Sequence, residues 1–347
     1  MVPTTSCQQI QRLSRRAAGS ATLFTMTVDT EEEWDWSSGW PTRNFGLKNI
    51  EELPRFQALC SRHGVAVTYF TAHAVLAEAR TRQIVQEISR QPHTEIGLHI
   101  HPWNTPPVIH DRTTARESFL HNLPHDVARG KLKTVYDLFL ECGLKPTSFR
   151  GGRYSTGSVI QDFLREKEFK VDASVVPFST WADDGAPDYR GRDIYPVRRE
   201  SKTKSAPLWE LPLTLGFSRR PFSFWSGVFN RIEYSPLRHL RLIGLWSRLG
   251  LVRKVWLTFE DPAGRNMLPF LRKLRRLKPP CICFTLHSSS FLTGGNGYVP
   301  TPAARDRIFA YVDEIFGEIA GWDDFQSATV TEAAALLERD YHACARN

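Results

Sequence analysis

Short apolar segments alternate with amphipathic segments along most of this chain, and this alternation constrains the fold more than any other feature. Five segments have the apolar, β-branched composition of buried strands: residues 21–28, 65–70, 94–98, 146–149 and 281–286. Helical periodicity is found at residues 49–63, 74–89, 120–142, 267–277 and 303–319, and a last helix begins at Thr331. Strands and helices that alternate at this spacing predict an α/β fold with a parallel sheet or barrel.

The length of the chain allows either two domains or one barrel. Its 347 residues exceed the roughly 250 residues that an α/β barrel routinely uses as one domain. With 41% hydrophobic and 24% charged residues, the chain has enough apolar side chains to form a core, which excludes a disordered protein. The alternation is lost between residues 178 and 261, apart from a short strand at 209–213. We therefore predict one barrel domain over residues 21–340, with an insertion at 178–261 and a disordered N-terminal segment at 1–20.

The cysteines and the N-terminal residues indicate where the protein is found. Six cysteines are scattered along the chain, and Cys281 and Cys283 form a CxC pair inside a predicted strand, not the CxxC pairs of a zinc site. Reduced, buried thiols are typical of cytosolic proteins. Residues 1–20 lack the apolar stretch of a signal peptide, and no segment has the roughly 18 uncharged apolar residues of a spanning helix. We predict a soluble, cytoplasmic protein.

The net charge of +8 is concentrated in one block, residues 234–259, which holds five cations and no acidic residue. Leucine, isoleucine and valine recur there at near-helical spacing, with the cations between them. This pattern is typical both of helices that lie on anionic membranes and of core-facing helices with a solvated basic face. Peripheral membrane contact is therefore one hypothesis for this block. Nucleic acid is not expected, because no recognition motif accompanies the charge.

Polar clusters follow several predicted strands, and the first two suggest a metal site. Asp29 and Glu31 follow the first strand, and on extended backbone both carboxylates face the same side. A solvated acidic loop is the alternative. His99 and His101 follow the third strand with the same spacing, so that two imidazoles can chelate one metal ion. Because chemistry in such folds occurs at the carboxyl ends of strands, the two clusters are expected in one pocket.

Three further clusters also fall at strand ends. Residues 149–154 read Phe-Arg-Gly-Gly-Arg-Tyr, in which two glycines allow close approach of the backbone to a ligand, although an ordinary glycine turn has the same composition. Asp172 is followed by Ser174, and His287 ends an apolar strand, where its imidazole can serve as a general acid. No GxSxG elbow is present to expose a nucleophilic serine.

In order and spacing, these five clusters resemble the five motifs of the polysaccharide deacetylases, the NodB-homology carbohydrate esterases of family four. The resemblance runs from Phe24 to about Ser290, and residues 297–299 with the following helix are similar to a sugar-deacetylase subgroup. Each motif is short, but five in register make the resemblance specific. It implies a distorted (β/α) barrel that hydrolyses the N-acetyl group of an amino sugar with a divalent metal, Zn²⁺ in the first place and Co²⁺ or Ni²⁺ as alternatives.

The resemblance also implies a role for each matching residue. Asp29 matches the catalytic base, Arg150 the arginine that holds this base, and Tyr154 lies where a backbone N–H contributes to the oxyanion hole. Asp172 matches the aspartate that tunes the acid, and His287 the histidine that protonates the leaving amine. These residue types suit amide hydrolysis, because an amide needs activation of its carbonyl and protonation of its nitrogen.

The sequence departs from the family pattern in its metal ligands. His99 matches the first metal histidine, but the second histidine usually comes four residues later, where this chain has Trp103, so His101 is expected to replace it. The second aspartate of the first motif is Thr30, and Glu31 is expected to be the carboxylate ligand, with Glu32 as the alternative. The proline of the arginine motif is also replaced, by a glycine at position 152.

Two other function classes remain open at the level of sequence. A metal-independent amidase of the allantoinase type on the same scaffold is suggested by the residues at positions 30 and 103, and chelation of the metal separates it from the first hypothesis. A non-catalytic glycan-binding protein is disfavoured, because Asp29, Arg150 and His287 are all present. The expected partner is an N-acetylated saccharide, and a lipid-linked saccharide or an anionic polymer would explain the basic block.

Overall fold

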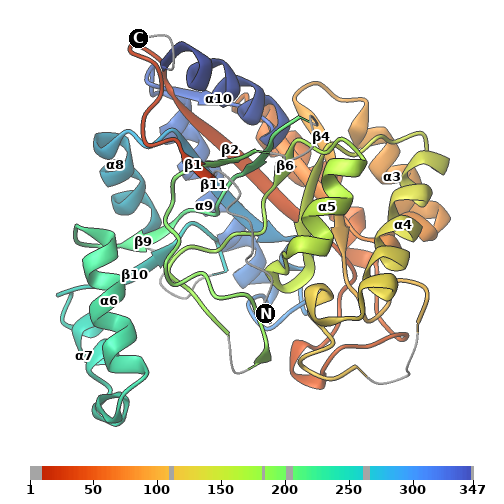
Figure 1. The fold of residues 1–347 in the computed structure, drawn as a ribbon, viewed down its shortest axis with the longest axis horizontal. Coiled ribbons are helices and arrows are strands. Elements are labelled where there is room, and N and C mark those ends of the chain that lie inside the picture. Colours follow the sequence, from red (N-terminus) through yellow and green to blue (C-terminus); the bar gives the residue numbers. More distant parts are fainter. Residues whose placement is uncertain (1–9, 109–112, 182–183, 201–205, 261–265, 345–347) are drawn as a thin grey trace, which may run out of the picture.

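A mostly parallel sheet forms the centre of the computed structural model, which describes residues 10–108, 113–181, 184–200, 206–260 and 266–344 (Figure 1). In spatial order its strands are β1 (Ile10–Arg12), β7 (Val197–Arg199), β8 (Leu208–Glu210), β6 (Val171–Asp172), β5 (Ser148–Gly151), β4 (Thr94–Ile100), β3 (Val67–Thr71), β2 (Thr22–Thr30) and β11 (Cys281–His287), and β12 (Phe325–Ser327) also pairs with β2. From β8 to β11 all neighbours are parallel, while β7 and β1 are antiparallel to their neighbours. The predicted α/β class is confirmed.

Residues 211–214 connect the two edges of the parallel sheet. The backbone N–H of Leu213 donates to Val175 O, just beyond β6, at 2.9 Å, and that of Thr214 donates to Cys283 O of β11 at 3.1 Å. One short segment is thus hydrogen-bonded to both sides, which gives the sheet the arrangement of a distorted barrel. All nine residues of β2 are buried, as expected for a central parallel strand covered on both faces.

The helices are α1 (Leu53–Arg62), α2 (His73–Ala77), α3 (Ala79–Ser89), α4 (His125–Glu141), α5 (Ser158–Glu166), α6 (Phe222–Glu233), α7 (Leu242–Arg248), α8 (Met267–Leu277), α9 (Pro302–Ala320) and α10 (Val330–Cys344). Two predicted helices begin or break differently, for local reasons. The side chain of Glu78 accepts from Thr81 N and caps α3, which separates α2 from α3. Pro124 restricts the residue before it, so α4 begins at His125 and not at residue 120.

The predicted insertion at 178–261 is smaller than expected, because β7 and β8 belong to the main sheet. What projects from the sheet is a two-stranded hairpin, β9 (Leu215–Phe217) and β10 (Lys254–Trp256), together with residues 222–251 between them. We call residues 222–251 the arm; it contains α6, the 3₁₀ turn at Pro236–Leu240 and α7, and it extends away from the body of the fold at the lower left of Figure 1. Asp261 lies outside the described residues.

The basic block at 234–259 is therefore not one helix. Arg241 has a left-handed conformation at φ 49° and separates the 3₁₀ turn from α7, and Gly250, at φ 67°, follows α7. The N-terminal segment also differs from the prediction, since β1 at Ile10–Arg12 pairs with β7. Residues 1–9 lie outside the described residues.

The expectations for the cysteines and for membrane-spanning helices can be compared with the structure directly. Cys60, Cys142, Cys281 and Cys283 are free and buried, as expected for thiols in a core. Among the described residues, no helix combines the length and the apolar character needed to cross a membrane.

Candidate active site

A cavity of about 590 Å³ opens where the carboxyl ends of β2, β4 and β11 meet. Six residues that the sequence singled out line it: Asp29, Glu31, His99, His101, Tyr154 and His287. Strand register explains why residues so distant in sequence meet, because Asp29 is paired with His287 across β2 and β11, and His99 with Arg150 across β4 and β5. The cavity is the candidate active site.

Three acceptor atoms face one another at one end of this cavity. The Nε2 atoms of His99 and His101 are 3.1 Å apart, and Glu31 Oε2 lies 3.2 Å from the first and 3.0 Å from the second. The three atoms form a nearly equilateral triangle, and all three side chains are buried. Ligands at about 2.0–2.1 Å from a tetrahedral metal lie about 3.3 Å from one another, so the triangle has the size of one face of such a site.

The other ring nitrogens of the two histidines determine which atoms point into the triangle. His99 Nδ1 donates to the backbone O of Arg150 at 2.8 Å, and His101 Nδ1 donates to Glu32 Oε1 at 2.7 Å. In a neutral imidazole whose Nδ1 is a donor, Nε2 is an acceptor. Metal-binding histidines usually have this second contact, to a carbonyl or a carboxylate.

Three electron-rich atoms at this separation need a positive charge among them. Burial alone would lower the pKa of His101, but Glu32 and Glu31 outweigh burial and raise it to about 10. A proton on one imidazole bridges only two of the three atoms, whereas a metal ion bonds to all of them. Glu31, His99 and His101 therefore fit a divalent cation, while Glu32 lies behind His101 and orients its ring.

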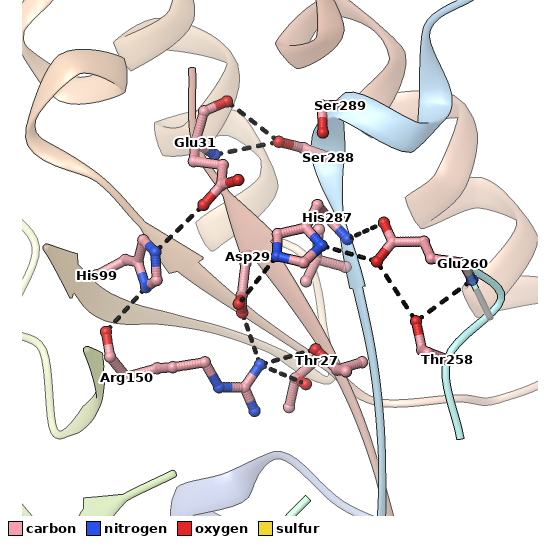
Figure 2. A network of polar contacts seen from close by, with 12 residues as sticks. Thr27, Asp29, Glu31, His99, Arg150, Thr258, Glu260, His287, Ser288 and Ser289 are labelled. Carbon is pink, nitrogen blue, oxygen red and sulfur yellow. Dashed lines mark hydrogen bonds and ion pairs between the residues drawn. The ribbon is translucent and has the colours of Figure 1, made fainter. Parts of the chain in front are cut away.

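Asp29 lies beside this triangle and is held by Arg150 (Figure 2). Nη1 of Arg150 donates to Asp29 Oδ1 at 2.6 Å and to the hydroxyl oxygens of Thr27 and Thr285 at 2.9 and 3.0 Å. Arg150 is completely buried, with its guanidinium 4.4 Å from the centre of the Phe70 ring. A buried guanidinium with this many acceptors fixes the orientation of the Asp29 carboxylate.

His287 lies on the other side of Asp29, with its Nε2 3.8 Å from Asp29 Oδ2. Its Nδ1 donates to Glu260 Oε2 at 2.7 Å, and its backbone N–H donates to Glu260 Oε1 at 2.9 Å. Burial alone would lower the pKa of His287, but Glu260, Glu31 and Asp29 outweigh burial and raise it to about 10. The raised pKa favours the protonated imidazole, which can donate a proton from Nε2.

The carboxylate that tunes His287 is thus Glu260, and the assignment of this role to Asp172 does not agree with the geometry. Asp172 accepts from the hydroxyl of Thr156 at 2.5 Å and from the backbone N–H of Ser174 at 3.0 Å, and it is not part of the cavity wall. Burial, followed by the charge of Glu210, raises the pKa of Asp172. The Ser174 hydroxyl in turn accepts from Gly151 N at 3.0 Å, so this cluster supports the loop after β5.

The two glycines after Arg150 are needed because neighbouring atoms leave no space for a side chain. A Cβ on Gly151 would lie 2.0 Å from Ser155 O, and one on Gly152 would lie 2.5 Å from the ring of His101. Tyr154 follows with a left-handed backbone at φ 60° and lines the cavity. Such backbone conformations are uncommon for residues with a side chain and concentrate at functional sites.

Aromatic side chains form most of the remaining wall: Trp34, Trp36, Trp40, Trp103, Phe119, Trp181, Trp256 and Tyr298. Trp103, which stands where the related motif has a histidine, stacks on His101 with ring centres 4.1 Å apart. Trp36 contacts the ring of His287 edge-on at 5.0 Å. The indole N–H groups of Trp36, Trp103 and Trp256 are buried and have no hydrogen-bond partner in the described part of the chain.

Sequence reasoning missed Glu260, Lys254 and the tryptophans of the acidic segment, Trp34 and Trp36. Glu260 follows β10 in the region without regular alternation, where no strand end could be recognised. The two tryptophans stand directly after the acidic run at residues 31–33, and this proximity is a signal that could have placed them in the pocket.

No protein-family model matches the chain, and no curated protein matches it. Several solved structures are similar in fold. A candidate polysaccharide deacetylase from Mycobacterium smegmatis has a TM-score of 0.54 at 15% identity, with 96% of each chain covered. A candidate glycoside hydrolase or deacetylase from Parabacteroides distasonis has a TM-score of 0.55 at 11% identity, covering 95% of this chain and 73% of that one.

A 4-α-glucanotransferase from Thermococcus litoralis is also similar, with a TM-score of 0.52 at 12% identity, covering 91% of this chain but only 40% of that one. At such low identities the common feature is the fold, and the roles of individual residues depend on the geometry of this cavity. The chain therefore has the distorted α/β barrel fold of the polysaccharide deacetylases, as its five sequence motifs predict.

Proposed function

We propose that the protein is a metal-dependent hydrolase that removes the N-acetyl group from an amino sugar in a glycan, a glycolipid or a sugar precursor. The observation that carries the proposal is the acceptor triangle of Glu31, His99 and His101 beside the Asp29–His287 pair. A metal site next to one base and one acid is the arrangement that amide hydrolysis requires. Zn²⁺ suits two imidazoles and one carboxylate best, with Co²⁺ and Ni²⁺ as alternatives.

In the proposed reaction the metal site, the base and the acid each have a separate role. A divalent cation at the triangle supplies Lewis acidity, which polarises the amide carbonyl and acidifies water. Asp29, held by Arg150, accepts the proton of the attacking water as the C–O bond forms. His287 Nε2 gives its proton to the amide nitrogen as the C–N bond breaks, so that acetate and a free amine leave. The backbone near Tyr154 is proposed to hold the oxyanion, a contribution of about 3–4 kcal/mol per donor.

The walls of the cavity support a saccharide as the substrate. Trp36, Trp103 and Trp256 are among the aromatic residues that line it. Aromatic rings present flat apolar surfaces that suit the C–H faces of a sugar ring.

The test is the release of acetate from a panel of N-acetylated sugars, nucleotide sugars and lipid-linked sugars. We expect acetate from one class, loss of release after chelation, and recovery on addition of Zn²⁺ or Co²⁺. Release that resists chelation would identify a metal-independent amidase instead. Saccharide binding without any acetate would identify a glycan-binding protein.

Glutamine in place of Glu31 is expected to reduce bound metal by at least about tenfold, because one of three ligands is lost. Glu32→Gln is the matched comparison and should retain most of the metal, since the amide oxygen of glutamine can still accept from His101 Nδ1 and from Asn104. Metal per chain is measured by elemental analysis of the purified proteins. The ligand assignment is wrong if Glu32→Gln loses the metal and Glu31→Gln keeps it.

Glutamine in place of Glu260 is expected to move the alkaline limb of the pH–kcat profile to lower pH. Glu260 is the largest of the contributions that raise the pKa of His287. An acid must be protonated to act, so activity falls as pH rises through its pKa, and a lower pKa moves this fall to lower pH. Asp172→Asn is the matched variant and should leave the limb in place. If Asp172→Asn moved the limb and Glu260→Gln did not, Asp172 would be the residue that sets the pKa of His287.

A further inference from the structure

The arm, residues 222–251, carries most of the large hydrophobic side chains that are exposed in the described part of the chain. Of eleven large hydrophobic side chains that are exposed, seven belong to it: Phe224, Tyr234, Leu237, Leu240, Leu245, Leu249 and Leu251. Leu240 and Leu249 are 62% and 63% exposed, the two highest values of this set. Single exposed apolar side chains are normal, but a gathering of this size marks an interaction surface.

The packing of the arm leaves its exposed leucines without a covering layer. Trp246 of α7 contacts Phe229 of α6, with ring centres 6.4 Å apart, and fixes the two helices against each other. Neither α7 nor the 3₁₀ turn before it contains a buried residue. Since a short helix is stabilised mainly by burial of its apolar face, α7 has a face that requires a partner outside the described chain.

The charge of the arm indicates which kind of partner it can bind. It holds four arginines at positions 231, 238, 241 and 248, and a single acidic residue, Glu233. In the described part of the chain no carboxylate forms an ion pair with any of the four. A second copy of this chain meeting the arm through the same face would bring like charges together, which is unfavourable. Arginines interspersed with exposed leucines fit an anionic lipid surface, which takes up both.

The arm is also attached directly to the cavity. Its two ends continue into β9 and β10, which pair so that Trp256 lies opposite Leu215. Both residues and Lys254 line the cavity. Lys254 Nζ donates to Phe178 O and Ser179 Oγ at 2.9 and 3.0 Å, which ties the hairpin to the cavity rim. The orientation of the arm thus determines where the cavity lies relative to a surface that the arm binds.

We propose that the arm docks the protein on an anionic lipid bilayer, with its exposed leucines in the interfacial layer and its arginines on the headgroups. The docked cavity lies beside the membrane, where a lipid-linked amino sugar is accessible to it. The docking is independent of the reaction, whereas the nature of the substrate rests on the proposed function.

The experiment is sedimentation of the full-length protein with vesicles of phosphatidylcholine alone or of phosphatidylcholine mixed with phosphatidylglycerol. We expect binding to the mixed vesicles, weakened by salt, and little binding to phosphatidylcholine. Leu240→Asp combined with Leu249→Asp should lower the partition coefficient at least about tenfold, since two apolar side chains no longer insert. Arg231→Gln combined with Arg248→Gln should weaken binding and flatten its salt dependence.

Matched controls change exposed residues away from the arm. Leu140→Asp on α4, where the leucine is 47% exposed, and Arg90→Gln after α3 should bind as the unaltered protein does. Asp29→Asn, which is expected to lose acetate release, should also bind the vesicles normally. Vesicle binding therefore tests the docking separately from the deacetylase assignment. No binding to anionic vesicles, or equal losses in the arm and control variants, would overturn the proposal. A dimer in solution that Leu240→Asp dissociates would assign the arm to self-association.

Discussion

Asparagine in place of Asp29 is expected to lower kcat for acetate release by about 10³-fold, within the range for loss of a general base. The amide has the shape of the carboxylate but cannot accept the proton of the attacking water. The buried charge of Arg150 keeps acceptors in this variant, because its Nη1 also donates to the hydroxyls of Thr27 and Thr285. We therefore expect a folded protein, checked by its melting temperature and its metal content.

Thr285→Val is the matched control for Asp29→Asn. It removes a different hydrogen bond from the same Arg150 nitrogen, at 3.0 Å, and leaves the Asp29 carboxylate in place. A positioning role for Arg150 predicts a loss of no more than about tenfold in this variant. If the two variants lost activity equally, the effect would come from disturbance of Arg150 and not from loss of a base. Full activity in Asp29→Asn would remove Asp29 from the mechanism.

The main strands and helices could be predicted because each has a local signature. Buried parallel strands such as β2 are continuous apolar runs, and helix α8 has the predicted bounds 267–277. The pairing of β1 with β7 could not be predicted, because three-residue strands carry no periodic signal and their partners are almost two hundred residues apart. β7 is equally short. The strand predicted at 209–213 is found as β8, but its place in the main sheet depends on its pairing with β6 and β7, which the sequence does not indicate.

The candidate site could be predicted to the extent that its residues stand at strand ends. Parallel register brings Asp29 and His287 to one edge, and alternation along β4 points His99 and His101 to the same side. Glu260 could not be predicted, since its place beside His287 depends on tertiary contacts of the segment after β10. The resemblance pointed to Asp172 for that role, although this aspartate is hydrogen-bonded elsewhere.

Alanine in place of His287 is expected to lower kcat for an N-acetylated sugar by about 10²–10⁴-fold, the range for loss of a general acid. Without the protonated imidazole the amide nitrogen leaves as an unstable anion. Glu260 retains the backbone N–H of residue 287 and the hydroxyl of Ser290 as donors, so it is not left unpaired. Metal content should not change, since His287 is not one of the three residues of the triangle.

The leaving group separates the roles of His287 and Asp29. In 4-nitrophenyl acetate the departing phenolate is stable at neutral pH and needs no proton. His287→Ala should therefore hydrolyse this ester with a loss of less than about tenfold, while Asp29→Asn should be slow on ester and amide alike, because water must be deprotonated in both. The ratio of ester to amide activity then rises strongly in His287→Ala and stays level in Asp29→Asn. Equal losses on both substrates in His287→Ala would mean that His287 supports the site without donating a proton.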